Sequence, residues 1–101
     1  MNNAPRTATF SRTTTETDIQ VSVSLDGESD SGIETGIGFL DHMLTALSKH
    51  SGIKILLKCV GDLDVDGHHT SEDCALALGT AIDEALGDRR GIRRFGAAYV
   101  P

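Results

Sequence analysis

Residues 19–25 read Ile-Gln-Val-Ser-Val-Ser-Leu, and this alternation of apolar and polar side chains decides the fold class. A period of two residues predicts a strand that buries one face and leaves the other in water. Shorter alternations predict strands over 7–12 and 33–37, with a polar turn at 13–17 after the first of them. The β-rich run over 53–60 predicts another strand. The sequence therefore predicts a sheet of four strands.

Two further segments place apolar residues at helical spacing and predict helices over 40–51 and 69–86. The expected inward stripes are Leu40, Met43, Leu44 and Leu47 on the first helix and Ala75, Leu78, Ile82 and Leu86 on the second. Asp73 is expected to lie away from the second stripe. Together these elements predict an α+β two-layer sandwich, with a mostly antiparallel four-stranded sheet and two helices on one face. Residues 93–100 read as the start of one more strand.

The composition limits the classes of protein to which the chain can belong. Its 101 residues fit one small domain, and 15 Asp and Glu against 9 Lys and Arg give a net charge of −6. Nucleic-acid and anionic-membrane binders need many Lys and Arg, so no nucleic acid and no membrane is expected as a partner. No apolar run approaches the ~20 residues that span a bilayer. Cys59 and Cys74 form no paired motif and are expected to be buried free thiols, which favours a reduced, cytoplasmic setting.

All four histidines lie between residues 42 and 69, and the sequence His-His-Thr-Ser-Glu at 68–72 is the main chemical signal. On a helix, His68 and Glu72 are four residues apart and project from one face, whereas His69 projects elsewhere. Imidazole and carboxylate groups in this arrangement suit a divalent metal. The alternative is a helix start at which the histidines form local hydrogen bonds and Glu72 interacts with the helix dipole. The motif alone leaves the two interpretations about equal.

His42 and His50 belong to the first predicted helix. His42 lies about 160–200° from the apolar stripe at ~100° per residue, so we expect it outside the core and available as a ligand. Asp41 beside it is a candidate to orient a histidine ring. A solvated helix face explains an exposed His42 equally simply. His50 lies nearer the stripe, where packing or substrate contact is expected rather than metal ligation.

Four arginines fall within residues 89–94, and arginine side chains suit the recognition of phosphate or carboxylate groups. For Arg89 and Arg90, a favourable interaction with the end of the preceding helix is the preferred interpretation. Arg94 enters the next predicted strand and is the better candidate for anion binding. The Gly-Ile-Gly-Phe turn at 36–39 completes neither a P-loop nor a dinucleotide-binding motif.

Four motifs, taken jointly, closely resemble the imidazoleglycerol-phosphate dehydratase family. They are Thr-Gly-Ile-Gly-Phe-Leu-Asp-His-Met-Leu at 35–44, Gly-Asp-Leu at 61–63, His-His-Thr-Ser-Glu-Asp at 68–73 and Ala-Leu-Gly-Asp-Arg-Arg-Gly-Ile-Arg-Arg-Phe-Gly at 85–96. They occur in the family's order and spacing, and the resemblance extends from about Thr7 over nearly the whole chain. Each motif alone is weak evidence, and their combination is specific.

The resemblance implies a manganese-dependent hydro-lyase of histidine biosynthesis, which removes water from imidazole glycerol phosphate to give imidazole acetol phosphate. It implies two Mn²⁺ per site, with metal ligands at His42, His68, His69 and Glu72. The implied catalytic residues are Glu16, in a Glu-Thr turn between the first two strands, and Glu72. The implied contacts with the phosphorylated imidazole substrate are Glu16, His42, His50, His68 and Arg94.

Members of this family consist of two similar halves, each with its own set of metal ligands. The resemblance places residues 1–92 in the first half of this duplicated fold and residues 93–101 at the opening strand of the second. It also implies a homo-oligomer, a closed shell of twenty-four subunits with active sites at subunit contacts. The alternative function is an inactive metal-binding or assembly fragment of the same fold.

Overall fold

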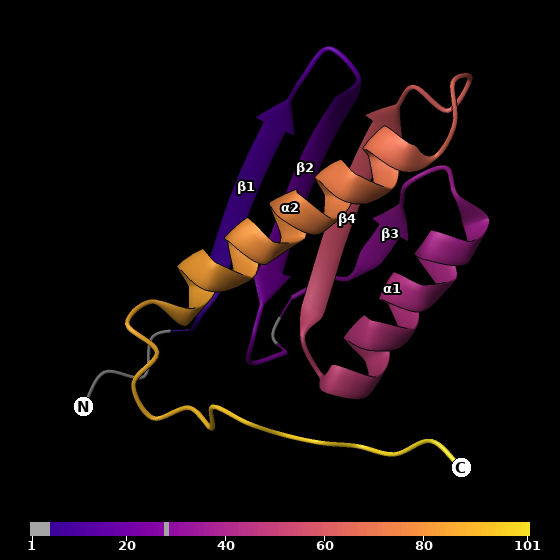
Figure 1. Ribbon diagram of the computed structural model, residues 1–101. Helices are drawn as coiled ribbons and strands as arrows, with labels where there is room; N and C mark the ends of the chain where they lie inside the picture. The colour runs from indigo at the N-terminus through magenta and orange to yellow at the C-terminus, as the bar shows by residue number, and fades with distance from the viewer. Residues whose placement is uncertain (1–4, 28) are drawn as a thin grey trace.

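The computed structural model describes residues 5–27 and 29–101, which form two helices and a four-stranded sheet (Figure 1). In chain order the elements are β1 (Thr7–Thr13), β2 (Thr17–Ser24), β3 (Gly32–Glu34), α1 (Gly38–Ser51), β4 (Lys54–Gly61) and α2 (His68–Leu86). Both helices lie on one face of the sheet, with α2 packed on β1, β2 and β4 and α1 packed on β3 and β4. The predicted α+β two-layer sandwich is confirmed. Neither helix of the described chain combines the length and the apolarity needed to cross a bilayer.

The sheet is mixed, with strand order β1-β2-β4-β3. β2 pairs antiparallel with β1 and with β4, so that Val21 lies opposite Phe10 on one side and Leu57 on the other. β3 pairs parallel with β4. A parallel pair needs a crossover connection, and α1 provides it between these two strands. The prediction of a mostly antiparallel sheet is confirmed, and β3 is the parallel exception.

The core lies between the sheet and the helices. Alternate residues of β2 and β4 point into it and are at most 6% exposed: Ile19, Val21, Val23, Ile55, Leu57 and Cys59. The side chains between them, such as Gln20 and Lys58, face the opposite, helix-free side. α2 covers the sheet with small or medium residues, namely Cys74, Ala77, Leu78, Ala81 and Ala85. Cys59 and Cys74 are buried free thiols, as predicted.

The inward face of α2 differs from the predicted stripe at Ala75 and Asp73. Ala75 is exposed, whereas Asp73 is only 7% exposed. Burial of a carboxylate is tolerated when hydrogen bonds and a counter-charge replace water. Thr17 Oγ1 donates to Asp73 Oδ2 at 2.6 Å, and Arg12 Nη2 lies 3.8 Å from Oδ1. Asp73 therefore joins α2 to the first two strands.

Replacing Asp73 with alanine should lower the free energy of unfolding by about 1–3 kcal/mol, because it leaves the buried Thr17 hydroxyl without its acceptor. Urea unfolding followed by circular dichroism measures this change. Glu84→Ala, at an exposed position of the same helix, should change the free energy by less than about 0.5 kcal/mol. Equal effects of the two substitutions would contradict the structural role of Asp73.

The strand expected over 93–100 is not formed in the described chain. This segment is extended and exposed, with Phe95, Tyr99 and Val100 each more than 90% accessible. A strand needs a hydrogen-bonded neighbour, and the segment runs along the bottom of the molecule in Figure 1 rather than beside an edge of the sheet. The division into residues 1–92 and 93–101 stays a prediction.

Candidate active site

The topology gathers three chain segments at one end of the sheet. The turn between β1 and β2, the end of β4 and the start of α2 all lie at the top of Figure 1. The register fixes this arrangement, because Thr17 at the start of β2 pairs with Gly61 at the end of β4. A short loop, residues 62–67, then leads directly into α2. We call this end of the molecule, with residues 14–17, 61–67 and the first turn of α2, the histidine end.

His68 and Glu72 lie one above the other on α2, as their spacing predicted. His68 is the first residue of the helix, and its backbone N–H donates to Asp66 Oδ1 at 2.9 Å. Its Nε2 lies 3.5 Å from Glu72 Oε2. Both side chains are well exposed, at 71% and 57%. The pair is therefore accessible from solvent in the described part of the chain.

His69 projects in another direction and is held by Asp62. Its Nδ1 lies 2.7 Å from Asp62 Oδ2, and its ring lies 5.5 Å from that of His68 at an interplanar angle of 67°. This hydrogen bond raises the pKa of His69 above its ordinary value, and the nearby negative charges of Asp62, Glu16 and Asp66 raise it further, while desolvation opposes them. His69 thus lies in a negative environment that also attracts metal cations.

Glu16 belongs to the same end of the molecule. It lies in the turn between β1 and β2 and is half buried. Thr14 Oγ1 accepts hydrogen bonds from the backbone N–H of Glu16 at 3.1 Å and of Thr17 at 3.0 Å. These bonds fix the backbone of the turn, so that the Glu16 carboxylate is near enough to influence His69 electrostatically. The sequence placed Glu16 far from the histidines, and the hairpin brings it to them.

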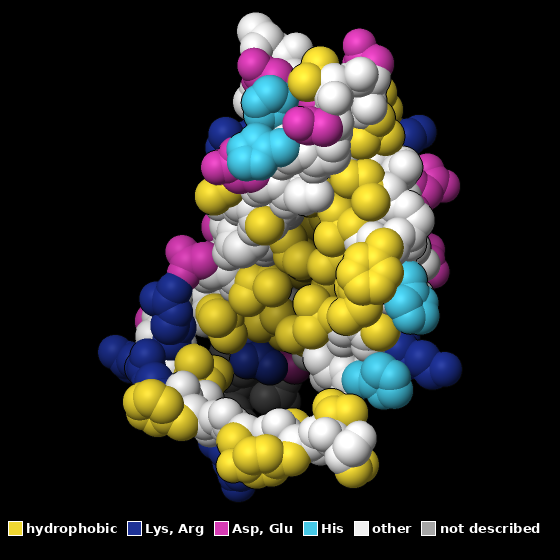
Figure 2. All heavy atoms as spheres, turned by 45° about the vertical axis from the view of Figure 1, so that its right-hand side comes forward, with side chains coloured by type: hydrophobic (Ala, Val, Ile, Leu, Met, Phe, Trp, Pro, Cys, Tyr) yellow, Lys and Arg dark blue, Asp and Glu magenta, His cyan; other side chains and the backbone are white. Residues whose placement is uncertain are grey.

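The other predicted site residues lie elsewhere in this chain. His42 is exposed on the second turn of α1, and His50 lies in the last turn of α1, at the opposite end of the sheet. Figure 2 shows the histidine side chains in two separate groups, one at the start of α2 and one along α1. Arg94 is exposed in the C-terminal segment, at the end of the molecule opposite the start of α2. Its Nη2 donates a hydrogen bond to the backbone oxygen of Arg89 at 3.4 Å.

Asp41 does not orient His42. Its Oδ1 accepts hydrogen bonds from the backbone N–H of Thr35, at 2.9 Å, and from the Thr35 hydroxyl. Thr35 is fully buried, so this contact fixes the connection between β3 and α1. The physical reason is competition: the carboxylate is engaged by two donors of the preceding loop and is not left free for a ring on its own helix.

The donor atoms at the histidine end suit a divalent metal, and they are too few to enclose one. Within residues 5–27 and 29–101, no three His, Cys, Asp or Glu side chains converge on a point where they would hold an ion. His68 and Glu72 form one open pair, and His69 projects away from it. A divalent metal held by these side chains would keep open coordination positions, which water or residues from outside the histidine end would fill.

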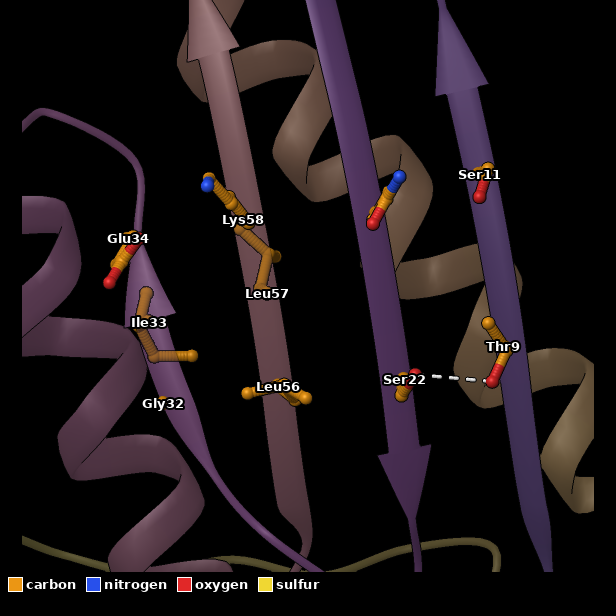
Figure 3. Close-up of a pocket in the computed structure, with 10 residues that line it drawn as sticks. Thr9, Ser11, Ser22, Gly32, Ile33, Glu34, Leu56, Leu57 and Lys58 are labelled. Carbon is orange, nitrogen blue, oxygen red and sulfur yellow. Dashed lines mark hydrogen bonds between the residues drawn. The ribbon is translucent and has the colours of Figure 1, made fainter.

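A cavity lies on the opposite face of the sheet, and no histidine is among the residues that line it. It has a volume of about 560 Å³ and is open to solvent on the helix-free face (Figure 3). In its wall, the hydroxyl groups of Thr9 and Ser22 form a hydrogen bond of 3.1 Å. Lys58 and Glu34 contribute the charged groups of its wall. The sheet lies between this cavity and the two helices that carry the histidines.

A second surface feature lies between the two groups of histidines. Phe39, Met43 and Leu47 follow one another at four-residue spacing on α1 and are 75%, 48% and 45% exposed, and Leu76 on α2 is 48% exposed. The prediction that Met43 and Leu47 face inward is therefore wrong, and Leu44 is the residue of that stripe that packs against the core. Figure 2 shows hydrophobic side chains gathered in a patch on this helical face. We call these four exposed residues the helix-face patch. A patch of this kind marks an interaction surface more often than an ordinary exposed face.

Comparison with known proteins decides the family. The family model of imidazoleglycerol-phosphate dehydratase matches residues 35–101. The chain belongs to this family. The dehydratase of Chlorobium phaeovibrioides is 65% identical over 96 residues, which are 95% of this chain and 48% of that protein. The dehydratase of Salinibacter ruber is 53% identical over 98 residues, 97% of this chain and 48% of that protein.

A solved dehydratase structure shares the fold. The crystal structure of imidazoleglycerol-phosphate dehydratase from Staphylococcus aureus superimposes with a TM-score of 0.77 at 35% identity, covering 94% of this chain and 50% of that one. The chain thus spans about half the length of the dehydratases that it matches.

Asp62 belongs to the residues of the histidine end to which the sequence analysis assigned no role. It is part of the Gly-Asp-Leu motif, and it lies seven residues before His69 across an irregular loop. Helical or strand periodicity does not relate the two positions. The available signal was the motif itself, which contains an acidic residue just after a strand and just before the histidine pair.

Proposed function

We propose that this chain is the N-terminal half of a manganese-dependent dehydratase, which converts imidazole glycerol phosphate to imidazole acetol phosphate in histidine biosynthesis in the cytoplasm. The observation that carries the proposal is the gathering of His68, His69, Glu72 and Glu16 at one end of the molecule. Membership of the dehydratase family supports the reaction, and the match to half of each relative supports the role as a half.

In the proposal, His68, His69 and Glu72 hold Mn²⁺ at the histidine end, and His42 serves a site completed by another chain segment or subunit. The mixture of imidazole and carboxylate donors supports a divalent transition metal and does not select manganese over zinc, iron or nickel. When bound, the metal would act as a Lewis acid towards the imidazole ring of the substrate.

Glu16 is the proposed acid–base residue. Dehydration breaks a C–H and a C–O bond of the glycerol chain, so one proton leaves carbon and one joins the departing hydroxyl. The carboxylate of Glu16 lies beside the histidine end on a turn that Thr14 fixes, which suits a group that must move a proton at a defined atom. Arg94 is proposed to hold the substrate phosphate, and His50 to contact substrate, in an assembly that brings the two ends of different subunits together.

Assembly is part of the proposal, because the histidine end lacks a full set of ligands. We propose that the helix-face patch is covered by a second copy of the same fold, and that further contacts build the twenty-four-subunit shell implied by the resemblance. Support comes from the exposed apolar side chains of the patch and from relatives about twice as long as this chain.

A chimera tests the proposed function. This chain replaces the matching half of the Chlorobium phaeovibrioides dehydratase, and the loss of imidazole glycerol phosphate is measured in the presence of Mn²⁺. Glu16→Gln in the chimera should lower kcat by about 10²–10⁴-fold, because it removes the acid–base group and keeps its size. Thr15→Ala, at the exposed neighbouring position of the turn, is the matched control and should keep kcat within about twofold of the parent chimera, since surface substitutions perturb little. An unchanged kcat for Glu16→Gln would remove Glu16 from the mechanism.

A further inference from the structure

The contact between Asp62 and His69 joins two elements across the loop at the histidine end. Asp62 directly follows β4, and His69 is the second residue of α2. The Asp62 side chain is 18% exposed and that of His69 is 40% exposed. Asp62 Oδ1 is buried and has no hydrogen-bond partner among the described residues, whereas Oδ2 lies 2.7 Å from His69 Nδ1. Oδ1 of Asp62 is thus shielded from water, and the hydrogen bond to His69 is the polar contact observed for this side chain among the described residues.

The direction of this hydrogen bond determines the state of the ring. An ionised carboxylate only accepts hydrogen bonds, so Nδ1 of His69 must be the donor. A neutral imidazole has one N–H, and when that proton is on Nδ1 the lone pair is on Nε2. A carboxylate that accepts from one ring nitrogen fixes the orientation of the ring and leaves the other nitrogen to bind a metal.

We propose that Asp62 is a positioning residue, which fixes His69 in its Nδ1–H form and so presents Nε2 to a divalent cation. The inference rests on the proposed metal role of His69. Asp62 itself touches neither metal nor substrate in this scheme. Glu16 and Asp66 also lie near enough to act on His69 through their charges, and Asp62 is the one among these three for which a hydrogen bond to the ring is observed.

Nuclear magnetic resonance of the metal-free 101-residue chain tests the first half of the proposal. Long-range proton–nitrogen correlation spectra, recorded above the pKa of the ring, identify the nitrogen that carries the proton. We expect Nδ1–H for His69 in the parent chain and in Asp62→Asn, whose amide oxygen still accepts a hydrogen bond. Asp62→Ala should move His69 towards the Nε2–H form that a free histidine side chain prefers. A parent ring with Nε2–H, or an unchanged ring in Asp62→Ala, would overturn the proposal.

Calorimetric titration with Mn²⁺ alone tests the second half. Asp62→Ala should weaken binding by about 10–100-fold, the cost of losing such a partner, and Asp62→Asn should restore most of it. Asp64→Ala is the control, because it removes the same charge from an exposed position of the same loop. Exposed charges contribute little, so the affinity for Mn²⁺ should change by less than about threefold. Equal affinities of the parent chain and Asp62→Ala would overturn the proposal. A parent chain that binds no Mn²⁺ refutes the metal role of His69 instead, and the spectra still decide whether Asp62 sets the ring.

Discussion

If the proposed metal role is right, replacing His68 and His69 together with alanine should strongly lower the amount of manganese that the 101-residue chain binds. The double variant loses both imidazole donors and leaves Glu72 as the last of the three proposed ligands there. Loss of a residue that only hydrogen-bonds a metal ligand weakens metal binding by about 10–100-fold. Because the double variant loses two ligands, we expect a larger fall in the affinity for Mn²⁺. Metal analysis after gel filtration in buffer with Mn²⁺ measures the change.

His50→Ala is the matched control for this experiment. It also removes one exposed imidazole, and it does so in the last turn of α1, at the opposite end of the sheet. Metal content should be unchanged in this variant. The same metal content in His68→Ala/His69→Ala as in the parent chain would exclude these residues from the metal site.

The second large effect concerns the helix-face patch. The parent chain should form dimers or larger assemblies, because covering Phe39, Met43 and Leu47 removes exposed apolar surface from water. Met43→Glu combined with Leu47→Glu places two charges in the centre of this interface, and burial of unpaired charges is costly. Light scattering should then give the mass of a monomer, 10.7 kDa for the parent composition.

Val60→Glu provides the control for the patch. Val60 is 65% exposed on β4, and its side chain alternates with the core residues of that strand towards the helix-free face. The oligomeric state should be insensitive to this substitution. A parent chain that is monomeric at all concentrations tested, or a Met43→Glu/Leu47→Glu variant that still associates, would contradict the assignment of the patch.

The burial pattern of β2 was predictable because its signal is local, whereas the inward stripe predicted for α1 was wrong at Met43 and Leu47. The two-residue alternation of 19–25 fixes which side chains of β2 enter the core, and the structure buries Ile19, Val21 and Val23 accordingly. Burial of Asp73 was not predictable in this way. Its main partner, Thr17, is 56 residues away in sequence, so periodicity along α2 carries no information about that contact. The parallel pairing of β3 likewise depends on the crossover through α1.

In the candidate site, too, contacts between residues near in sequence were predictable and contacts between distant segments were not. The four-residue spacing of His68 and Glu72 is a local helical property, and the structure confirms that they face each other. The approach of Glu16 depends on the pairing of β2 with β4, and the contact between Asp62 and His69 depends on the shape of an irregular loop. Neither relation follows from spacing. The distances from the histidine end to His42 and Arg94 also depend on tertiary structure and, in the proposed assembly, on other subunits.

Turnover by the chimera tests the central claim most directly. The claim is that this chain supplies one half of a manganese-dependent dehydratase site. The chimera with the matching half of the Chlorobium phaeovibrioides dehydratase should consume imidazole glycerol phosphate with Mn²⁺, lose activity in EDTA and regain it when Mn²⁺ is restored. A chimera that folds, assembles and binds Mn²⁺ but does not dehydrate the substrate would contradict the claim and favour an inactive metal-binding or assembly fragment.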